Sequence, residues 1–294
     1  METIFFVSVV VPTYNRCNML GNCLNSLFAQ TYPANKLEVI VVNDGSTDRT
    51  EDILRKYENK APCAFKWMTI KNKGSASARN QGIKKSKGEL ICFIDDDCIA
   101  TRTWVENLIK KFRDDEIVGI GGKIQTHKAE NIFEKYGMLM DQEKTIKENS
   151  GIITSNCAFR KKILEKIDGF DENLRNLEDF DLGLRARMQG WELSYSPKAI
   201  VWHRHRSNLK QLLKQHYFQG IGLAVLCKKH NFFPLKYQLY LRLLRAVKFF
   251  ILLSTHLLLF KKEKASMNFI HLLTTFSQLL GLIKGIFFNK YFVN

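Results

Sequence analysis

Residues 89–98 read Glu-Leu-Ile-Cys-Phe-Ile-Asp-Asp-Asp-Cys, an apolar run that ends in three consecutive acids. The apolar run predicts a buried strand. Ligands of open α/β sheets bind outside the carboxyl ends of the strands, so the acids are expected at a ligand crevice. Neighbouring carboxylates repel one another unless a cation lies among them, and a divalent cation carrying phosphates suits such oxygen ligands. A solvated acidic turn is the alternative for this stretch taken alone.

The segments before this strand alternate between predicted strands and predicted helices. The predicted strands are 7–11, 37–42 and 65–70, and the predicted helices are 18–30, 48–57 and 75–87. Asp48 and Glu51 have the spacing of a capping box, and Gly88 suits the end of the last helix. The alternation predicts an α/β fold with a doubly wound, mostly parallel sheet. The ends of the first strands of this sheet, at Pro12, Asp44 and Asp95, should then meet at one crevice.

The positive charge is concentrated near the C-terminus. The 294 residues carry a net charge of +16, and residues 204–294 hold fifteen lysines and arginines against one acid, Glu263. Two domains are therefore expected, 1–206 and 207–294. A cationic region indicates nucleic acid or an anionic membrane surface as a partner. The seven cysteines include no Cys-x-x-Cys, which favours reduced thiols in a cytosolic setting.

The residues after 207 are predicted to be helical, with apolar stretches at 249–260 and 269–288. The second stretch has the 3.6-residue period of an amphipathic helix. Neither is an uninterrupted apolar run of about 20 residues, as a transmembrane helix needs. Helices lying in the interface of an anionic membrane, on its cytoplasmic face, are favoured. A soluble helical cap or homo-oligomer interface and a short transmembrane hairpin are the alternatives.

Six short segments, taken in order, resemble the inverting family 2 glycosyltransferases, which have a GT-A fold. The segments are Val9–Arg16 (Val-Val-Val-Pro-Thr-Tyr-Asn-Arg), Val42–Asp48 (Val-Asn-Asp-Gly-Ser-Thr-Asp), Gly74-x4-Arg79-Asn80-x-Gly82, Asp95–Asp97, Gly169–Glu172 (Gly-Phe-Asp-Glu) and Glu178-Asp179-x-Asp181-Leu182. The resemblance covers roughly residues 5–206, and its specificity lies in the order of the segments. It implies a nucleoside diphosphate sugar as donor and a divalent metal, Mn²⁺ or Mg²⁺, as cofactor.

The resemblance places the metal and part of the donor at the three acids. Asp95 and Asp97 have the family's Asp-x-Asp spacing for ribose and metal contacts, and Asp96 is expected on the donor as well. His203 matches a position where many relatives carry a metal- or diphosphate-binding histidine. It also belongs to a basic cluster, His203–Arg206, which is its alternative interpretation.

Other donor contacts follow from the first segments. By the resemblance, Pro12 and Tyr14 frame the nucleobase, and Asp44 contacts it, since a carboxylate accepts a hydrogen bond from a uracil N–H. Asp44 would otherwise form a turn before Gly45. Arg79 is expected near a helix N-terminus, where it would bind phosphate. A solvated surface arginine is the alternative.

Asp179 is the expected general base, by the same resemblance. An acceptor hydroxyl must lose its proton as the new bond forms. Glu178, adjacent and of like charge, would raise the pKa of Asp179 toward a value useful for a base. Both acids would also suit the first turn of a helix over 180–188, whatever their chemical role.

The leading hypothesis is a membrane-associated hexosyltransferase that acts in cell-envelope polysaccharide synthesis. It would use a UDP-sugar and a glycan or lipid-linked acceptor. One alternative is a processive polysaccharide synthase, although the Gln-x-x-Arg-Trp pattern is absent from the sequence. The other is a basic protein without enzymatic activity that binds membranes or nucleic acid. No RNA-recognition signature is present, so nucleic acid is not expected as a partner.

Overall fold

The computed structural model describes residues 4–127, 129–137, 141–148, 151–174, 176–231 and 234–287. These residues form two compact units. The first unit contains the described residues of 1–127, 140–172 and 178–204, and the second contains those of 128–139, 173–177 and 205–294. The boundary expected at 206 stays a prediction.

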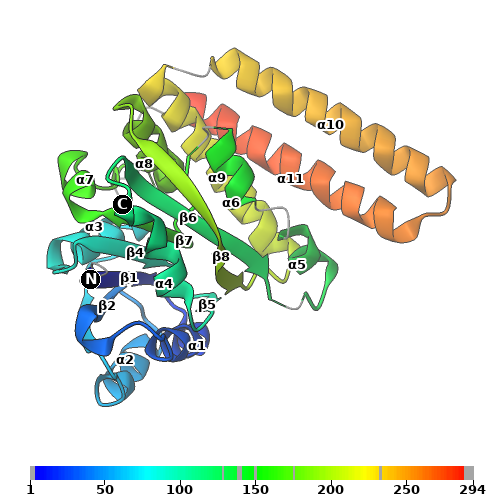
Figure 1. The fold of residues 1–294 in the computed structure, drawn as a ribbon. Helices are drawn as coiled ribbons and strands as arrows, with labels where there is room; N and C mark the ends of the chain where they lie inside the picture. The colour runs from blue at the N-terminus through cyan, green and yellow to red at the C-terminus, as the bar shows by residue number, and fades with distance from the viewer. Residues whose placement is uncertain are drawn as a thin grey trace. The chain divides into compact units, whose positions relative to one another are not determined.

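The described part of the first unit is built on a sheet in the order β3-β2-β1-β4-β7-β6-β8-β5 (Figure 1). The strands are β1 (Val7–Thr13), β2 (Leu37–Asn43), β3 (Ala64–Thr69), β4 (Leu90–Ile94), β5 (Cys98–Ala100), β6 (Ile117–Thr126), β7 (Asn156–Arg160) and β8 (Glu192–His203). Strands β3, β2, β1 and β4 run parallel. This confirms the predicted sheet.

Strand β7 reverses the direction in the middle of the sheet. It pairs antiparallel with both β4 and β6, while β6 and β8 are parallel to each other. The short β5 pairs antiparallel with the end of β8, and in this pairing Cys98 lies opposite His203. This last pairing brings the residue after the three acids next to the expected histidine.

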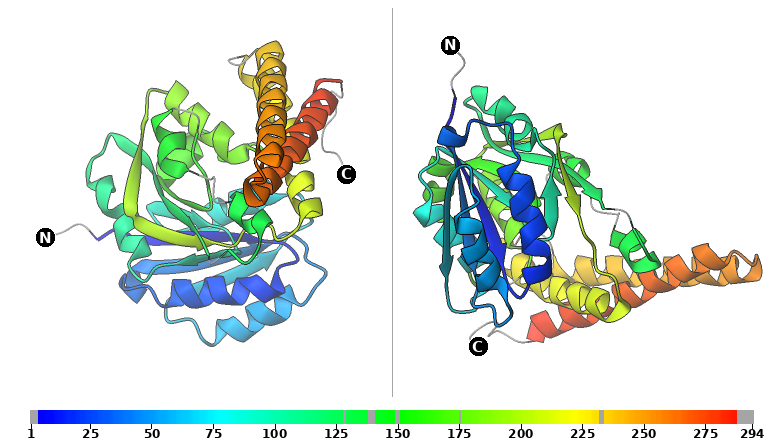
Figure 2. Two further views of the ribbon diagram at one scale, coloured as in Figure 1. Left: turned by 90° about the vertical axis from the view of Figure 1, so that its right-hand side faces the viewer. Right: turned by 90° about the horizontal axis from the view of Figure 1, so that it is seen from below.

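Helices cover both faces of this sheet. They are α1 (Cys17–Phe28), α2 (Thr50–Glu58), α3 (Ser75–Lys85), α4 (Trp104–Ile109), α6 (Gln142–Lys147), α7 (Lys161–Lys166) and α8 (Glu178–Met188), with 3₁₀ turns at Ala34–Lys36 and Lys110–Arg113. Successive side chains of a strand point to opposite faces. Accordingly Val9 packs in one core with α1, α2 and α4, and Val10 packs in the other with α3, α7 and α8. Figure 2 shows α1 and α2 together on one side of the sheet.

Two local predictions were wrong in detail. The capping box does not form, because the Asp48 carboxylate accepts from the N–H and hydroxyl of Thr50, and Glu51 accepts from Thr69. Helix α3 ends at Lys85, because the Ser86 hydroxyl donates to the Gly82 carbonyl and caps the last turn. Gly88 instead allows close backbone approach, since a Cβ there would lie 2.5 Å from the Ser8 nitrogen.

The second unit is helical, as predicted. It contains α5 (Ile132–Gly137), α9 (Leu209–His230), α10 (Leu235–Leu258) and α11 (Lys262–Phe287). Glycines let α9 and α11 touch along their backbones: a Cβ at Gly281 would lie 1.9 Å from the Tyr217 carbonyl oxygen, and one at Gly220 would lie 2.0 Å from that of Gln278. Helices α10 and α11 lie side by side as a hairpin (Figures 1 and 2).

The hairpin exposes many apolar side chains. Among the described helices, α11 is long and apolar enough to cross a membrane by length and composition, and a third of its most apolar window is buried. The exposed apolar residues of α10 include Tyr237, Tyr240, Leu243, Leu244, Val247, Phe250, Ile251, Leu257 and Leu258. The predicted amphipathic stretch extends to Phe288, which lies outside the described residues.

Candidate active site

The expected strand ends are neighbours in the sheet. Strand β1 lies between β2 and β4, so the residues that follow these strands share one edge. Pro12 is buried in β1 opposite Val42, and the Thr13 carbonyl accepts from the Asp44 N–H at 2.8 Å. Tyr14, one residue further, is exposed. The predicted convergence of strand ends is therefore present.

Asp44 holds the loop that leads into α3. Its two carboxylate oxygens accept hydrogen bonds from the N–H groups of Lys73 and Gly74, each at 2.8 Å. Gly74 has φ of 96°, a conformation that glycine adopts without steric cost. Asp44 thus positions the N-terminus of α3, a role beyond the expected turn. Its contact with a nucleobase stays a prediction.

The three consecutive acids each have a different partner. Asp95 pairs with Arg79 at 2.7 Å, and Asp97 pairs with Arg16 at 3.1 Å. Asp96 accepts from the Thr13 hydroxyl at 2.7 Å. Burial, with the neighbouring charge of Asp97, raises the pKa of Asp96 to about 7. Burial and a neighbouring like charge both favour the neutral form of a carboxyl group, so Asp96 holds its proton more tightly than an exposed aspartate does.

Sequence reasoning assigned no role to Arg16. Its guanidinium lies beside Asp97, and its side chain is 28% exposed. Arg16 closes the Val9–Arg16 segment, so its position in that motif was the available signal. It places a positive charge next to the acids and leaves part of the guanidinium open to solvent.

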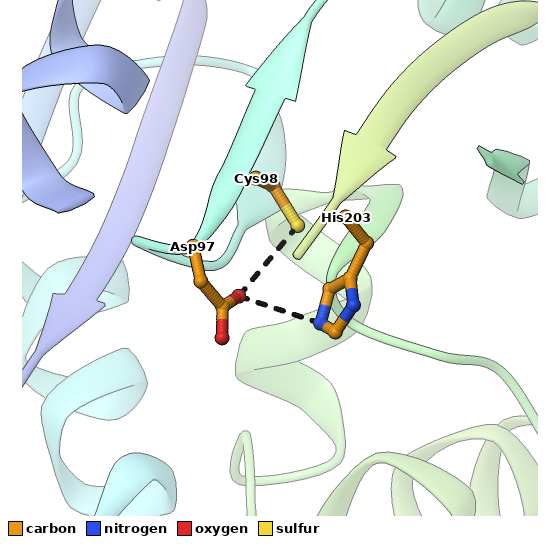
Figure 3. Close-up of side chains that lie close together, drawn as sticks. All are labelled: Asp97, Cys98 and His203. Atoms are coloured by element: carbon orange, nitrogen blue, oxygen red, sulfur yellow. Dashed lines mark hydrogen bonds and ion pairs between the residues drawn. The ribbon is translucent and has the colours of Figure 1, made fainter. Parts of the chain in front are cut away.

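A candidate metal centre lies at the end of the acids. Asp97, Cys98 and His203 point toward one another, and their ligand atoms lie within 4.8 Å of one another (Figure 3). His203 Nε2 is 3.4 Å from Asp97 Oδ1, and the Arg204 N–H donates to the Asp97 carbonyl. The thiol of Cys98 was not predicted. The carboxylate oxygens of Asp97 suit both Mn²⁺ and Mg²⁺, whereas imidazole and thiolate ligands suit later first-row ions.

A second acidic pair begins α8. Glu178 accepts from the Ser75 hydroxyl and from Arg79 Nη1, the latter at 2.8 Å. Leu177, directly before it, has φ of 63°, an uncommon conformation for a branched side chain that is found at functional turns. The strained turn and two donors therefore fix where Glu178 and Asp179 lie.

Arg79 joins the two acidic groups. Its Nη2 binds Asp95 and its Nη1 binds Glu178, and its Cζ lies over the Phe170 ring, 5.6 Å from the ring centre. The side chain is 4% exposed, so it is not the solvated arginine of the alternative interpretation. A phosphate contact by Arg79 stays a prediction. Its present contacts join Asp95, directly after β4, and Glu178, the first residue of α8, in one network.

Asp179 has a pKa suited to proton transfer near neutral pH. Burial and the adjacent Glu178 raise its pKa to about 7, against the opposing effect of Arg79. Its Oδ1 accepts from the Phe180 N–H at 2.9 Å. The structure thus gives Asp179 the raised pKa that its neighbour was expected to cause, with burial as the larger cause.

The sequence matches models of glycosyltransferase families. The model described as Glycosyl transferase family 2 matches residues 8–168, and Glycosyl transferase family group 2 matches residues 90–287. Glycosyltransferase AglE of Haloferax volcanii is 30% identical over 75% of this chain and 74% of its own length. Probable glycosyltransferase YdaM of Bacillus subtilis is 30% identical over 78% of this chain. The match spans only 58% of YdaM, so part of that relative has no counterpart here.

Solved structures share the fold at low sequence identity. The mannosyltransferase PcManGT from Pyrobaculum calidifontis, in complex with GDP-Man and Mn²⁺, superposes with a TM-score of 0.70 and 19% identity over 95% of this chain and 88% of that chain. S. aureus TarS 1–349, in complex with UDP-GlcNAc, superposes with a TM-score of 0.56 and 18% identity, over 95% of this chain and 90% of that chain. These likenesses confirm the GT-A fold expected from the sequence.

Proposed function

The chain belongs to glycosyl transferase family 2, and we propose that it transfers a sugar from a nucleoside diphosphate sugar to an acceptor hydroxyl with inversion. The observation that carries this proposal is the network from Asp95 through Arg79 to Glu178 and Asp179. It joins the strand-end acids, which suit the donor diphosphate, to a carboxylate that suits the acceptor proton. Inversion follows from a single displacement, in which one base and one leaving group act on opposite sides of the sugar.

On the donor side, Asp97 and His203 would hold the divalent metal, with Asp95 beside them. The bound metal would supply positive charge against the negative charge that develops on the leaving diphosphate. Arg16, already beside Asp97, adds a second cation there and carries donors that fit phosphate oxygens. Asp96, which is held by Thr13, would bind the donor through its second oxygen.

On the acceptor side, Asp179 would take the proton from the attacking hydroxyl. A base works best when its pKa lies near the working pH, and the pKa of Asp179 is about 7. Glu178 would act by position, because Arg79 and Ser75 hold its carboxylate and its charge helps to keep Asp179 basic. Glu178 is therefore a positioning residue in this scheme.

The donor base and the acceptor follow from the sequence expectations. A UDP-sugar is proposed, with Asp44 accepting from the base and Pro12 and Tyr14 beside it. Strand-end placement of all three residues supports this assignment. A glycan or lipid-linked acceptor of the cell envelope, met at the cytoplasmic face of the membrane, is proposed from the exposed apolar residues of α10 and the basic charge of 204–294.

A transfer assay with product analysis tests the proposal. The protein is incubated with UDP-sugars and GDP-mannose in Mn²⁺ and with glycan or polyisoprenyl-phosphate acceptors, and the product glycoside is analysed by proton NMR. The expected product carries the anomeric configuration opposite to that of the donor. A product with retained configuration would contradict the single displacement and the role of Asp179.

A further inference from the structure

The helical unit contains a cationic cluster that the proposed chemistry does not use. Arg242, Arg245 and Lys248 are spaced three residues apart on α10, so neighbouring members are close on the helix and the row turns from the buried Arg242 to the exposed Lys248. His216 of α9 and His271 of α11 lie close enough to Arg245 for its positive charge to oppose their protonation. Burial, His271 and Arg245 lower the pKa of His216 to about 4, and burial, Arg245 and Lys248 lower that of His271.

Ring packing fixes the two imidazoles in place. His271 stacks on Phe249 with ring centres 4.3 Å apart and an interplanar angle of 4°. Tyr136 of α5 contacts His271 at 4.7 Å and His216 at 5.7 Å, and its hydroxyl lies 2.8 Å from that of Thr274. These ring contacts join four helices of the unit and hold both partly buried imidazoles in place.

Arg242 is a buried cation whose hydrogen bonding is incomplete. It is 9% exposed, and its Nη1 donates to the carbonyl and side-chain oxygens of Gln238. Its Nε is buried without a hydrogen-bond partner in the described structure. Burial and the repulsion of Arg245 lower the pKa of Arg242 to about 10. A buried charge left in this state costs free energy, which an anion at the same place would recover.

The unit has few acids to neutralise the cluster. Within 205–231 and 234–287 the only acid is Glu263, and it pairs with Lys135 at 2.9 Å. Glu134 of α5 accepts instead from the Glu130 N–H at 2.7 Å. Across the described residues, no carboxylate forms an ion pair with Arg242, Arg245 or Lys248. An anion from outside the chain would therefore meet no competing carboxylate from the described residues at these three side chains.

We propose that Arg242, Arg245 and Lys248, together with His216 and His271, bind the phosphate head group of an anionic membrane phospholipid. The lipid chains would lie along the exposed apolar side chains of α10 that are nearest to Arg245 and Lys248 around the helix, Leu241 and Leu244. A single helix thus carries both parts of the surface that an amphiphile with an anionic head requires. The inference rests on the membrane attachment proposed above, and it replaces diffuse attraction with a specific site. Arginine suits phosphate because its planar donors bind two oxygens at once.

Vesicle binding separates a phosphate site from diffuse charge. Phosphatidylcholine vesicles are doped with phosphatidic acid or with cholesteryl hemisuccinate, a carboxylate lipid, at equal surface charge. The full chain should bind the phosphatidic acid vesicles about tenfold more tightly, the value of one hydrogen-bonded charged contact. Arg245→Gln, an exposed position, should lose that preference. Lys236→Gln removes the same charge from an exposed position of α10 outside the cluster and should keep it.

A vesicle-free measurement distinguishes failure of this site from failure of the membrane proposal. Inorganic phosphate, followed by NMR of the His216 and His271 ring protons, should raise the pKa of both histidines in the wild type and in Lys236→Gln but not in Arg245→Gln. Equal binding to both lipids by the wild type would overturn the site while leaving membrane attachment intact. A phosphate response without any vesicle binding would overturn the lipid assignment and the attachment. Tighter binding of a polyisoprenyl phosphate than of phosphatidic acid would overturn the phospholipid and make this an acceptor site.

Discussion

Two buried arginines, one in each unit, have opposite surroundings. Arg79 in the first unit lies between Asp95 and Glu178, with contacts of 2.7 and 2.8 Å. Arg242 in the second unit has Gln238 as its hydrogen-bond partner and Arg245 as a repelling neighbour. Arg79 thus has carboxylate partners within the chain, and Arg242 has none among the described residues. The comparison teaches that a preorganised catalytic network carries its own counter-ions, whereas a binding surface leaves that role to its ligand.

The largest expected effect tests the network at its acceptor end. Asp179→Asn keeps the shape of the side chain and removes its basicity, so kcat should fall by about 10²–10⁴-fold, the usual contribution of a positioned base. Donor affinity should change little. Glu165→Gln, an exposed residue on α7 of the same unit, is the charge-matched control and should keep full activity. Turnover within a few-fold of wild type for Asp179→Asn would make that residue structural.

The next effect tests Arg79, the arginine that has carboxylate partners. Arg79→Gln leaves Asp95 and Glu178 close together without their shared cation, so the free energy of unfolding should fall by about 3–5 kcal/mol. Urea denaturation followed by circular dichroism measures this change. A loss below about 1 kcal/mol would mean that the network is not balanced by Arg79.

A smaller effect concerns pH. Asp179 must be ionised to accept a proton, so kcat/KM should fall about tenfold per unit as the pH drops below its pKa of about 7. The free energy of unfolding depends on pH in the opposite direction. Because the folded-state pKa is raised, the protonated form stabilises the fold below about pH 4, and this contribution is lost as the pH rises through 7. A pH-rate profile without an inflection between 6 and 8 would contradict the assignment.

The smallest effect is expected at Arg242, the arginine without a carboxylate partner in the described structure. Arg242→Met removes a buried charge and keeps the volume, so the free energy of unfolding should stay within about 1 kcal/mol of wild type or rise, since the lost bonds to Gln238 are offset by the recovered desolvation cost. The same denaturation experiment measures it beside Arg79→Gln. Equal and large losses for both arginines would break the contrast between the two units.

The sequence predicted the first half of the sheet well because its signals there are local. Strands β1, β2 and β4 are short apolar runs that end at polar turns, and a run of this kind depends little on distant contacts. Strand β6 contains three glycines and ends in polar residues, so it has no clear strand pattern. A Cβ at Gly119 would lie 2.6 Å from the Phe159 ring, which shows that these glycines are required by packing between strands.

The residues of the candidate site could be singled out from the sequence, and their roles stay predictions, but the contacts among them could not be foreseen. Asp95, Asp97, His203 and Asp179 stand in recognisable segments. The link that Arg79 makes between Asp95 and Glu178 joins residues 16 and 99 positions away, and no local pattern encodes it. Cys98 was not predicted as part of the metal site for a related reason: its position opposite His203 depends on the pairing of β5 with β8.

The measurement that tests the account most directly is donor-dependent thermal stabilisation. The melting temperature is recorded with nucleoside diphosphates and sugar nucleotides, in Mn²⁺ and in EDTA, for the wild type and for Asp97→Asn. A ligand that binds only the folded state raises the melting temperature. The account predicts that at least one nucleoside diphosphate sugar stabilises the wild type in Mn²⁺ and that EDTA or Asp97→Asn abolishes the shift. A shift that is equal in Mn²⁺ and EDTA for both proteins would contradict a metal-dependent donor site at the strand-end acids.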